Sequence, residues 1–291
     1  MSGGLDQRLA ALDEAAGLAR GRLDPAPVDA AEAVVRRAGQ RLGLGVEATV
    51  VALAGPTGAG KSTLFNALAG AELSSPGVRR PTTSTATAAV WGADGDALLD
   101  WLQVGRRHRV GEGPLDGLVL LDLPDFDSVQ DAHRLEVERV IGIADLVVWV
   151  VDPQKYADGA WHERYLRPLA SHAGTMEVVL NQADRLAPDA RPALARDLTG
   201  LLRADGLDGV PVHAVSARTG LGLPELRDAI ARRVAARTAA AARLEADVRS
   251  AARALGAGCE TSSGRGEVRR EERARLTVAL EEAAGVPTVV R

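Results

Sequence analysis

The feature that most constrains this chain is the eight-residue segment GPTGAGKS at residues 55–62. It fits the pattern G-x-x-x-x-G-K-[ST], with the apolar run 49–54 before it and the apolar helical stretch 62–69 after it. Glycines let a loop wrap so that successive main-chain N–H groups point at phosphate oxygens, and the following helix adds the positive end of its dipole. The segment therefore predicts a strand, a phosphate-binding loop and a helix, rather than an ordinary glycine-rich turn.

Around this loop, apolar runs of about five to seven residues alternate with helical stretches. Runs that are continuously apolar indicate strands covered on both faces, as in a parallel sheet. We therefore expect a P-loop NTPase fold, a three-layer α/β/α domain with a mostly parallel sheet, over residues 47–223. The expected strands are 48–54, 86–91, 117–122, 145–151, 176–181 and 211–215, and the expected helices are 61–69, 128–142, 158–170 and 188–204.

Helical segments flank this domain on both sides. Two helices are expected before it, at 5–22 and 28–43, separated by the Asp-Pro-Ala-Pro segment 24–27. A helical hairpin is expected after it, at 224–256 and 267–284, with a turn at 257–266. The expected division is an N-terminal helical segment 1–46, the central domain 47–223 and a C-terminal helical hairpin 224–291.

Composition excludes several classes of protein. The 35 basic and 39 acidic residues leave a net charge of −4, which does not favour nucleic-acid binding by bulk charge. The single cysteine, Cys259, rules out a disulfide framework and a cysteine-rich metal site. The longest strongly apolar run, 146–151, is too short to span a bilayer, and the N-terminus has no signal-peptide core. We therefore expect a soluble, cytoplasmic protein.

The basic residues include only two lysines, Lys61 and Lys155. A chain that otherwise uses arginine keeps lysine where the compact ammonium group is needed. Lys61 lies in the phosphate loop, where it would reach the β- and γ-phosphates, and the Ser62 hydroxyl would bind Mg²⁺. Lys155 follows the strand 145–151 at the sheet edge that faces the nucleotide in such folds. A surface position is the simpler expectation for Lys155, and a role near the second switch or a partner is the alternative.

Three further motifs follow expected strands. Asp122 ends the strand 117–122 in Leu-Leu-Asp-Leu-Pro-Asp, the segment Asn-Gln-Ala-Asp occupies 181–184, and Ser-Ala-Arg occupies 216–218. Together with the phosphate loop they have the order and approximate spacing of D-x-x-G, N-K-x-D and S-A-K. Over about residues 48–236, the chain thus resembles the translation-factor class of GTP-binding proteins, and within it the Era-, Der- and YfjP-like bacterial GTPases.

The resemblance implies that the chain binds GTP and GDP together with Mg²⁺. Asp184 would accept hydrogen bonds from guanine N1 and N2, which adenine cannot donate, and the Ala217 N–H would donate to guanine O6. An ordinary capped strand-to-helix turn is the alternative for Asn181 and Asp184. The implied nucleotide-binding residues are Gly55, Pro56, Thr57, Gly58, Ala59, Gly60, Lys61, Ser62, Thr63, Asn181, Gln182, Asp184, Ser216, Ala217 and Arg218.

The resemblance also implies metal-binding and catalytic residues. Ser62, Asp122 and Thr83 would hold Mg²⁺, with Thr82 and Thr85 as alternatives to Thr83 in the polar segment 74–87. The implied catalytic residues are Lys61 and Thr83, and Asp125, as a group that could position water, is a further catalytic candidate from the residues themselves.

Four positions depart from the family pattern. Asp125 replaces the glycine of D-x-x-G, and its carboxylate near the triphosphate would weaken GTP binding unless it turns away. Phe126 cannot orient water as the glutamine of Ras-like proteins does, which implies slow or partner-assisted hydrolysis. Gln182 replaces the lysine of N-K-x-D, and Gly58 replaces the asparagine of potassium-dependent relatives. Arg79 and Arg80 as arginine fingers, or Asp127 as a group that positions water, are further catalytic candidates.

The resulting hypothesis is a GTP-dependent switch whose segments 74–87 and 123–135 change order for a protein partner. That partner is a paired GTPase or the protein's own membrane segment beyond residue 291, which places the chain in the cytoplasm or at the cytoplasmic face of a membrane. The alternatives are a regulatory module with negligible turnover, a ribosome- or RNA-associated assembly GTPase, and an ATPase. The basic cluster 106–109 is expected to form a polar hairpin, with a contact to a partner or to acidic lipid as the alternative.

Overall fold

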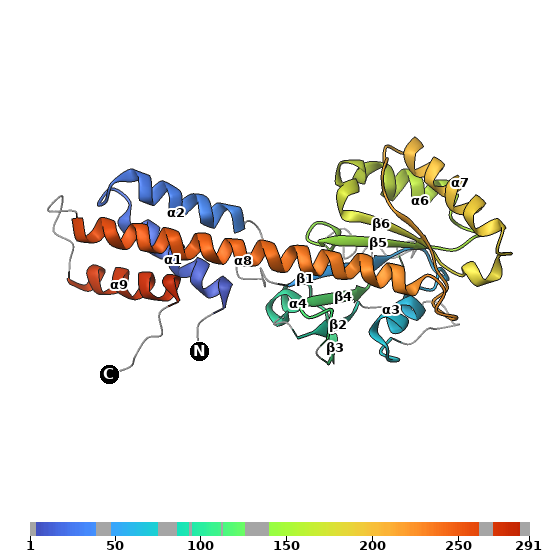
Figure 1. Ribbon diagram of the computed structural model, residues 1–291, viewed down its shortest axis with the longest axis horizontal. Coiled ribbons are helices and arrows are strands. Elements are labelled where there is room, and N and C mark those ends of the chain that lie inside the picture. The colour runs from blue at the N-terminus through green and yellow to red at the C-terminus, as the bar shows by residue number, and fades with distance from the viewer. Residues whose placement is uncertain are drawn as a thin grey trace. The chain divides into compact units, whose positions relative to one another are not determined.

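The computed structural model describes residues 4–38, 48–74, 86–92, 95–111, 113–125, 140–261 and 270–285. The chain divides into two compact units, one made of residues 48–235 and the other of residues 1–47 with 236–291 (Figure 1). Each unit has a hydrophobic core of its own. We call them the sheet unit and the helical unit.

The sheet unit is built on one seven-stranded sheet with the strand order β3-β2-β4-β1-β5-β6-β7. Neighbouring strands run parallel except β2 and β4, which run antiparallel. This arrangement confirms the predicted α/β class with a mostly parallel sheet. The strands are β1 Thr49–Ala54, β2 Thr87–Trp91, β3 Arg106–Val110, β4 Leu118–Asp122, β5 Leu146–Val151, β6 Met176–Leu180 and β7 Val212–Ala214.

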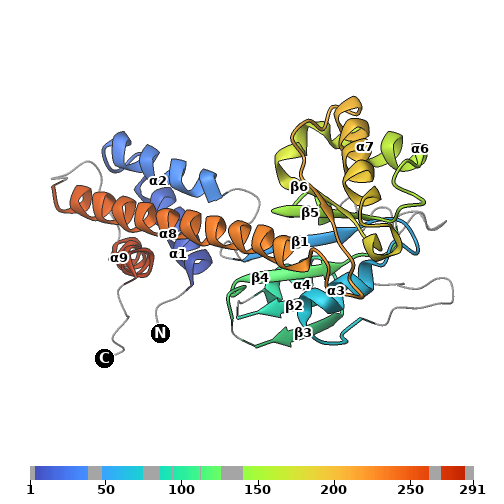
Figure 2. The same cartoon turned by 45° about the vertical axis from the view of Figure 1, so that its right-hand side comes forward.

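Helices cover both faces of this sheet, which is why its central strands are apolar throughout. Every residue of β1 and β5 is buried. Side chains of α3 and of the first turns of α8 pack on one face, and Figure 2 shows α6 and α7 on the other. The helices are α3 Lys61–Ala69, α4 Asp96–Trp101, α6 Gly159–Trp161, α7 Ala190–Ala204 and α8 Leu223–Thr261.

Two expected elements of the sheet unit differ in the structure. The helix expected at 158–170 is broken into α6, a π-helical turn at His162–Leu166 and a 3₁₀ segment at Arg167–Thr175. Pro168 lies at the start of that last segment, where it has no N–H to donate to an α-helical ladder. Of the helix expected at 128–142, residues 128–139 lie outside the described residues.

The polar hairpin expected at Arg106–Arg109 is wrong, because these residues form the edge strand β3. The strand β3 pairs in parallel with β2, and α4 lies between the two strands along the chain. Arg107 and Arg109 point back to that helix, with Arg107 Nη2 at 2.6 Å from Asp100 Oδ1 and Arg109 Nη2 at 2.7 Å from Asp96 Oδ2. A charged edge strand of this kind resists pairing with strands of other molecules.

The helical unit consists of α1 Leu5–Ala19, α2 Pro25–Ala38, the later turns of α8 and α9 Arg270–Ala284. Its core is formed by small and aliphatic side chains of all four helices. The helix α2 begins at Pro25 and not at residue 28 as expected, because the first turn of a helix needs no N–H donor and tolerates proline. Within the described residues, no helix combines the length and the apolar character that crossing a bilayer requires.

The long helix α8 contributes to both cores. The predicted division assigned all of residues 224–291 to one helical hairpin and did not include this double role. Leu226, Ile230 and Val234 belong to the core of the sheet unit. Val248 and Leu255 belong to the core of the helical unit. The helix α8, which has no glycine or proline between residues 225 and 255, is therefore one of two covalent links between the units, and the other lies between residues 47 and 48.

This packing predicts that Leu226→Ala lowers the free energy of unfolding of the sheet unit by about 2–5 kcal/mol, because Leu226 is fully buried and its loss leaves a cavity. Chemical denaturation followed by tryptophan fluorescence measures this, since all four tryptophans lie between residues 91 and 161. The exposed Arg232, also on α8, is the control, and Arg232→Ala should leave the transition unchanged. Equal transitions for both variants would contradict the assignment of these turns to the sheet core.

Candidate functional site

The phosphate loop joins β1 to α3 and lies against two other strands of the sheet. Gly60 has a φ of +88°, and a Cβ there would lie 2.5 Å from the amide nitrogen of Asn181. A Cβ on Gly55 would lie 2.1 Å from the carbonyl oxygen of Val150 on β5. Both positions therefore require glycine, the first for its backbone conformation and its neighbour and the second for the neighbour alone.

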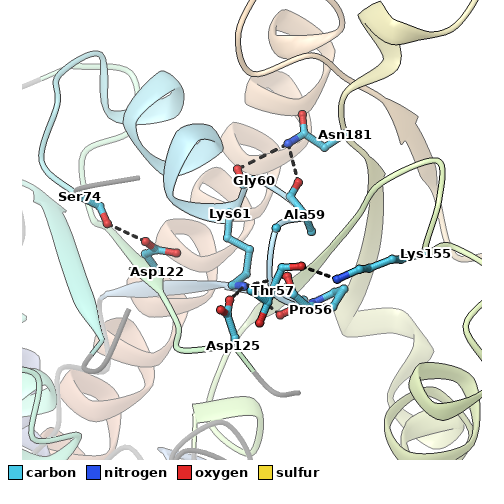
Figure 3. A network of polar contacts seen from close by, with 12 residues as sticks. Pro56, Thr57, Ala59, Gly60, Lys61, Ser74, Asp122, Asp125, Lys155 and Asn181 are labelled. Carbon is cyan, nitrogen blue, oxygen red and sulfur yellow. Dashed lines mark hydrogen bonds and ion pairs between the residues drawn. The ribbon is translucent and has the colours of Figure 1, made fainter. Parts of the chain in front are cut away.

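Lys61, the first residue of α3, is 4% exposed and turns back under the loop. Its ammonium nitrogen donates to the carbonyl oxygens of Gly55, at 2.9 Å, and Pro56, at 3.3 Å. It also forms an ion pair with the carboxylate of Asp125 (Figure 3). The charge of Lys61 is therefore already matched by a carboxylate in this structure.

Asp125, which stands where the family pattern has glycine, contacts the phosphate-loop lysine directly. Asp125 is 8% exposed, and its carboxylate occupies the side of the Lys61 ammonium left free by the two loop carbonyls. An anion that enters the loop competes with this carboxylate for Lys61. The candidates Phe126 and Asp127, and the switch residues Arg79, Arg80, Thr82, Thr83 and Thr85, lie outside the described residues.

Asp122, the last residue of β4, is fully buried beside the loop. Its Oδ2 accepts a hydrogen bond of 2.8 Å from the Ser74 hydroxyl, whereas its Oδ1 has no hydrogen-bond partner among the described residues. Burial raises the pKa of the Asp122 carboxyl, although the nearby Ser62 hydroxyl and the charge of Lys61 oppose the rise. An orphaned buried carboxylate oxygen close to Ser62 fits a hydrated Mg²⁺ ion, whose waters can donate to it.

The described residues contain no cluster of three histidine, cysteine or acidic side chains that could hold a metal ion by itself. A divalent ion at Ser62 and Asp122 therefore requires oxygen ligands from outside this part of the chain. Phosphate oxygens and water are such ligands, and Mg²⁺ is usually held in this way.

Asn181 connects the phosphate loop with two other motifs. Its side-chain nitrogen donates to Ala59 O at 2.8 Å, and its side-chain oxygen accepts from the Ala217 N–H at 3.1 Å. The next residue, Gln182, has a φ of +59° and donates from Nε2 to Gly58 O at 3.0 Å. The segments at 181–184 and 216–218 are thereby tied to the loop across more than 120 residues of chain.

A pocket of about 470 Å³ opens where these three segments meet. The volume is within the usual range for sites that bind small ligands. The pocket is lined by Gly60, Thr63, Asn181, Gln182, Asp184, Arg185, Ser216, Ala217 and Arg218. Hydrogen bonds from Ser216 and Arg218 hold the pKa of Asp184 below its usual range, so this carboxylate is an ionised acceptor at neutral pH.

The structure adds Lys155 to the site, although the sequence analysis favoured a surface position for it. The ammonium group of Lys155 donates to the carbonyl oxygen of Thr57 in the phosphate loop, at 2.6 Å (Figure 3). Two signals in the sequence pointed to it. Lysine is otherwise avoided in this chain, and Lys155 follows the apolar run 145–151, whose carboxyl end is expected at the sheet edge that faces the nucleotide.

Comparisons with known proteins agree with this geometry. Residues 50–182 match the family described as 50S ribosome-binding GTPase. The tRNA modification GTPase MnmE of Halorhodospira halophila is 28% identical over 198 residues, which cover 67% of this chain and 35% of that protein. GTPase Era of Erythrobacter litoralis is 28% identical over 188 residues, which cover 62% of this chain and 54% of that protein. The chain thus spans about a third to a half of these curated relatives.

Among solved structures, a member of a bacterial dynamin pair that senses and tethers membranes superposes with a TM-score of 0.50. The two are 14% identical, and the match covers 89% of this chain and 46% of the other. At this identity the likeness concerns the fold alone.

The sheet topology, the phosphate loop and the family match together define a P-loop GTPase domain. The match of residues 50–182 to the family described as 50S ribosome-binding GTPase, together with the similarity to GTPase Era, confirms the resemblance to the Era-like bacterial GTPases.

The environment of Asp122 predicts opposite effects of Asp122→Asn on stability and on metal dependence. Because burial raises the pKa of this carboxyl, its ionisation costs stability, and a neutral amide that still accepts from Ser74 should stabilise the metal-free protein. The gain is full above the raised pKa and disappears as the pH falls below the ordinary range of aspartate. Thermal unfolding between pH 3 and 8 measures it.

The same variant should lose about 10–100-fold of the affinity for Mg²⁺ in the presence of nucleotide, since it removes a charged partner of the ion's waters. Titration of Mg²⁺ into the nucleotide complex measures this loss. Asp116→Asn, an exposed position in a turn, is the matched control and should change neither property. An unchanged Mg²⁺ affinity for Asp122→Asn would contradict the assignment of the metal site.

Proposed function

We propose that this chain binds GTP and GDP with Mg²⁺, hydrolyses GTP slowly to GDP and phosphate, and acts as a nucleotide-dependent switch for a partner. The observation that carries the proposal is the convergence of Asn181, Asp184 and Ala217 beside the phosphate loop, around one pocket of about 470 Å³. A phosphate-binding loop next to a polar pocket with an ionised acceptor is the arrangement that a purine nucleoside polyphosphate requires.

Guanine is the base that this pocket would select. Asp184 is an ionised acceptor at the pocket wall, and guanine presents two adjacent N–H donors where adenine presents none in the same arrangement. In this structure Asp184 is paired with Arg218 instead, and Arg218 is exposed and free to move aside. The Ala217 N–H on the same wall donates to Asn181 Oδ1 in this structure, and it would have to turn to, or be shared with, the carbonyl oxygen of a bound guanine.

The phosphates would lie along the loop, with Lys61 and the main-chain N–H groups as donors. Ser62 and Asp122 would hold Mg²⁺, completed by a switch threonine, Thr83 or one of its alternatives Thr82 and Thr85. When bound, the ion neutralises phosphate charge and so favours phosphoryl transfer. The loop and Lys61 would position the phosphates, and Asp122 would accept hydrogen bonds from the waters of the ion.

Slow hydrolysis follows from the position of Asp125. The triphosphate has to replace the Asp125 carboxylate on Lys61, and the displaced charge then lies close to the γ-phosphate. A partner that moves Asp125 away would accelerate both binding and hydrolysis. The same ion pair supports a second candidate function, a regulatory module that holds nucleotide with negligible turnover.

The partner itself is proposed only by class. The family description, 50S ribosome-binding GTPase, and the relative named for tRNA modification suggest a ribosome- or RNA-associated role. The net charge of −4 argues against a surface that binds RNA by bulk charge. A protein partner, either a second GTPase or a membrane-bound assembly at the cytoplasmic face, suits the acidic chain better. A salt-dependent RNA-binding measurement separates these two roles.

Calorimetric titration with GDP and with a non-hydrolysable GTP analogue, each with and without Mg²⁺, tests the proposal. We expect Asp184→Asn to lose about tenfold or more in affinity for GDP and to discriminate less between guanine and adenine nucleotides, because a charged hydrogen bond is lost. Asp189→Asn, at the exposed N-terminus of α7, should bind like the wild type. Wild-type protein that prefers ADP, or that binds no nucleotide at millimolar concentration, would refute the guanine assignment.

Asp125→Gly restores the usual glycine and should raise the affinity for the GTP analogue by about tenfold, because the competitor for Lys61 is gone. The nucleotide-free variant should unfold at a lower temperature, since it leaves a buried ammonium without its carboxylate, and bound nucleotide should reverse this loss. Asp125→Asn, which keeps the shape and removes the charge, is the companion variant. Weaker binding of the analogue by both variants would show that Asp125 assists the nucleotide and does not compete with it.

A further inference from the structure

Both lysines of the chain donate to main-chain carbonyls of the same loop. Lys61 reaches Gly55 O and Pro56 O from α3, and Lys155 reaches Thr57 O from the turn after β5. Figure 3 shows the two ammonium groups approaching the loop from these different elements. Three successive carbonyls of the phosphate loop thus accept hydrogen bonds from positively charged groups.

Hydrogen bonds on both sides of Lys155 fix the turn that carries it. The buried side chain of Asp152 accepts the N–H of Gln154 at 2.8 Å and of Lys155 at 3.1 Å. The following carbonyl, that of Tyr156, is in turn 2.9 Å from Nε2 of the buried His162. These contacts fix the backbone on both sides of Lys155, so its half-buried side chain is directed at the loop.

The charges of the two lysines are balanced differently. Asp125 neutralises Lys61, whereas the ammonium of Lys155 has no carboxylate partner among the described residues. An ammonium group has three N–H donors, and the bond to Thr57 O uses one of them. Lys155 can therefore keep its bond to the loop and donate to a phosphate oxygen at the same time.

The position of the base pocket indicates which phosphate of a bound nucleotide would lie nearest Lys155. Of the loop and the first turn of α3, only Gly60 and Thr63 line that pocket. A nucleotide with its base there extends its phosphates along the loop away from Gly60, towards Thr57. The terminal phosphate therefore lies on the side of Thr57 and Lys155.

We propose that Lys155 is a second phosphate-binding cation, which contacts the terminal phosphate of GTP and stabilises the charge that develops there during hydrolysis. This inference rests on the proposed function. Transfer of a phosphoryl group needs little from a protein beyond positioning and neutralisation of charge. A cation that arrives already bonded to the loop supplies both without reorganisation of the site.

The test compares Lys155→Met and Lys155→Arg with Arg233→Met. Arg233 also donates to a main-chain carbonyl, that of Gly174, but away from the nucleotide pocket, so it controls for the loss of a cation-to-carbonyl bond. Affinities for GDP and for a non-hydrolysable GTP analogue are measured by calorimetry, and phosphate release by single turnover. Thermal unfolding of each nucleotide-free variant is measured alongside.

We expect Lys155→Met to weaken binding of the GTP analogue about tenfold while GDP affinity changes less than about twofold, and to slow single-turnover phosphate release about tenfold or more. Lys155→Arg should recover part of both losses, because it keeps the charge. Arg233→Met should resemble the wild type in every measurement.

Other outcomes overturn the inference in distinguishable ways. Equal weakening of GDP and analogue binding, together with a lower melting temperature, would make Lys155 a structural support of the loop. Wild-type affinity and turnover in Lys155→Met would leave the proposed function standing and remove this inference alone. Failure of the wild type to bind guanine nucleotides would remove both.

Discussion

The contact on which the rest of the site depends is the close packing of the phosphate loop against Asn181. The Asn181 amide lies where a side chain on Gly60 would be, and it bonds to Ala59 on one side and to Ala217 on the other. One side chain from the end of β6 thus holds together three segments that are far apart in the chain. The pocket beside the loop exists because these segments cannot move independently.

The charged side chains of this site are paired with one another, and a bound nucleotide with its metal ion would have to replace these pairs. Lys61 is neutralised by Asp125, Asp184 is paired with Arg218, and Asp122 keeps one buried oxygen without a partner among the described residues. A phosphate would replace Asp125 on Lys61, a guanine base would replace Arg218 on Asp184, and the waters of a metal ion would donate to the unpartnered oxygen of Asp122. The ion pairs stabilise the empty site, and their exchange for ligand contacts is a cost that lowers affinity. Under the proposed function, such a site would bind GTP and turn it over slowly until a partner moves Asp125 away.

Much of the fold and most of the site could be predicted from local patterns. Continuously apolar strands identified the parallel sheet, and the G-x-x-x-x-G-K-S segment with Asp122, Asn181 and Asp184 identified the resemblance to Era-like GTPases. The edge strand β3 was missed because four of its five residues are three arginines and a histidine, without an apolar alternation. Arg107 and Arg109 are accounted for only by their ion pairs with Asp100 and Asp96 on α4. The dual role of α8 was missed because one uniform alanine- and arginine-rich helix carries no mark where one core ends and the other begins.

The amino-acid sequence by itself determined the strand–loop–helix unit, the class of fold and the identity of the motifs, because glycine spacing and apolar periodicity act over a few residues. Only the tertiary structure decided which charges meet. The pairing of Lys61 with Asp125, the tie from Asn181 to Ala217 and the reach of Lys155 to Thr57 join residues 36 to 98 positions apart. Such contacts depend on how the ends of β1, β4, β5 and β6 are arranged along one edge of the sheet, and no local pattern specifies that arrangement.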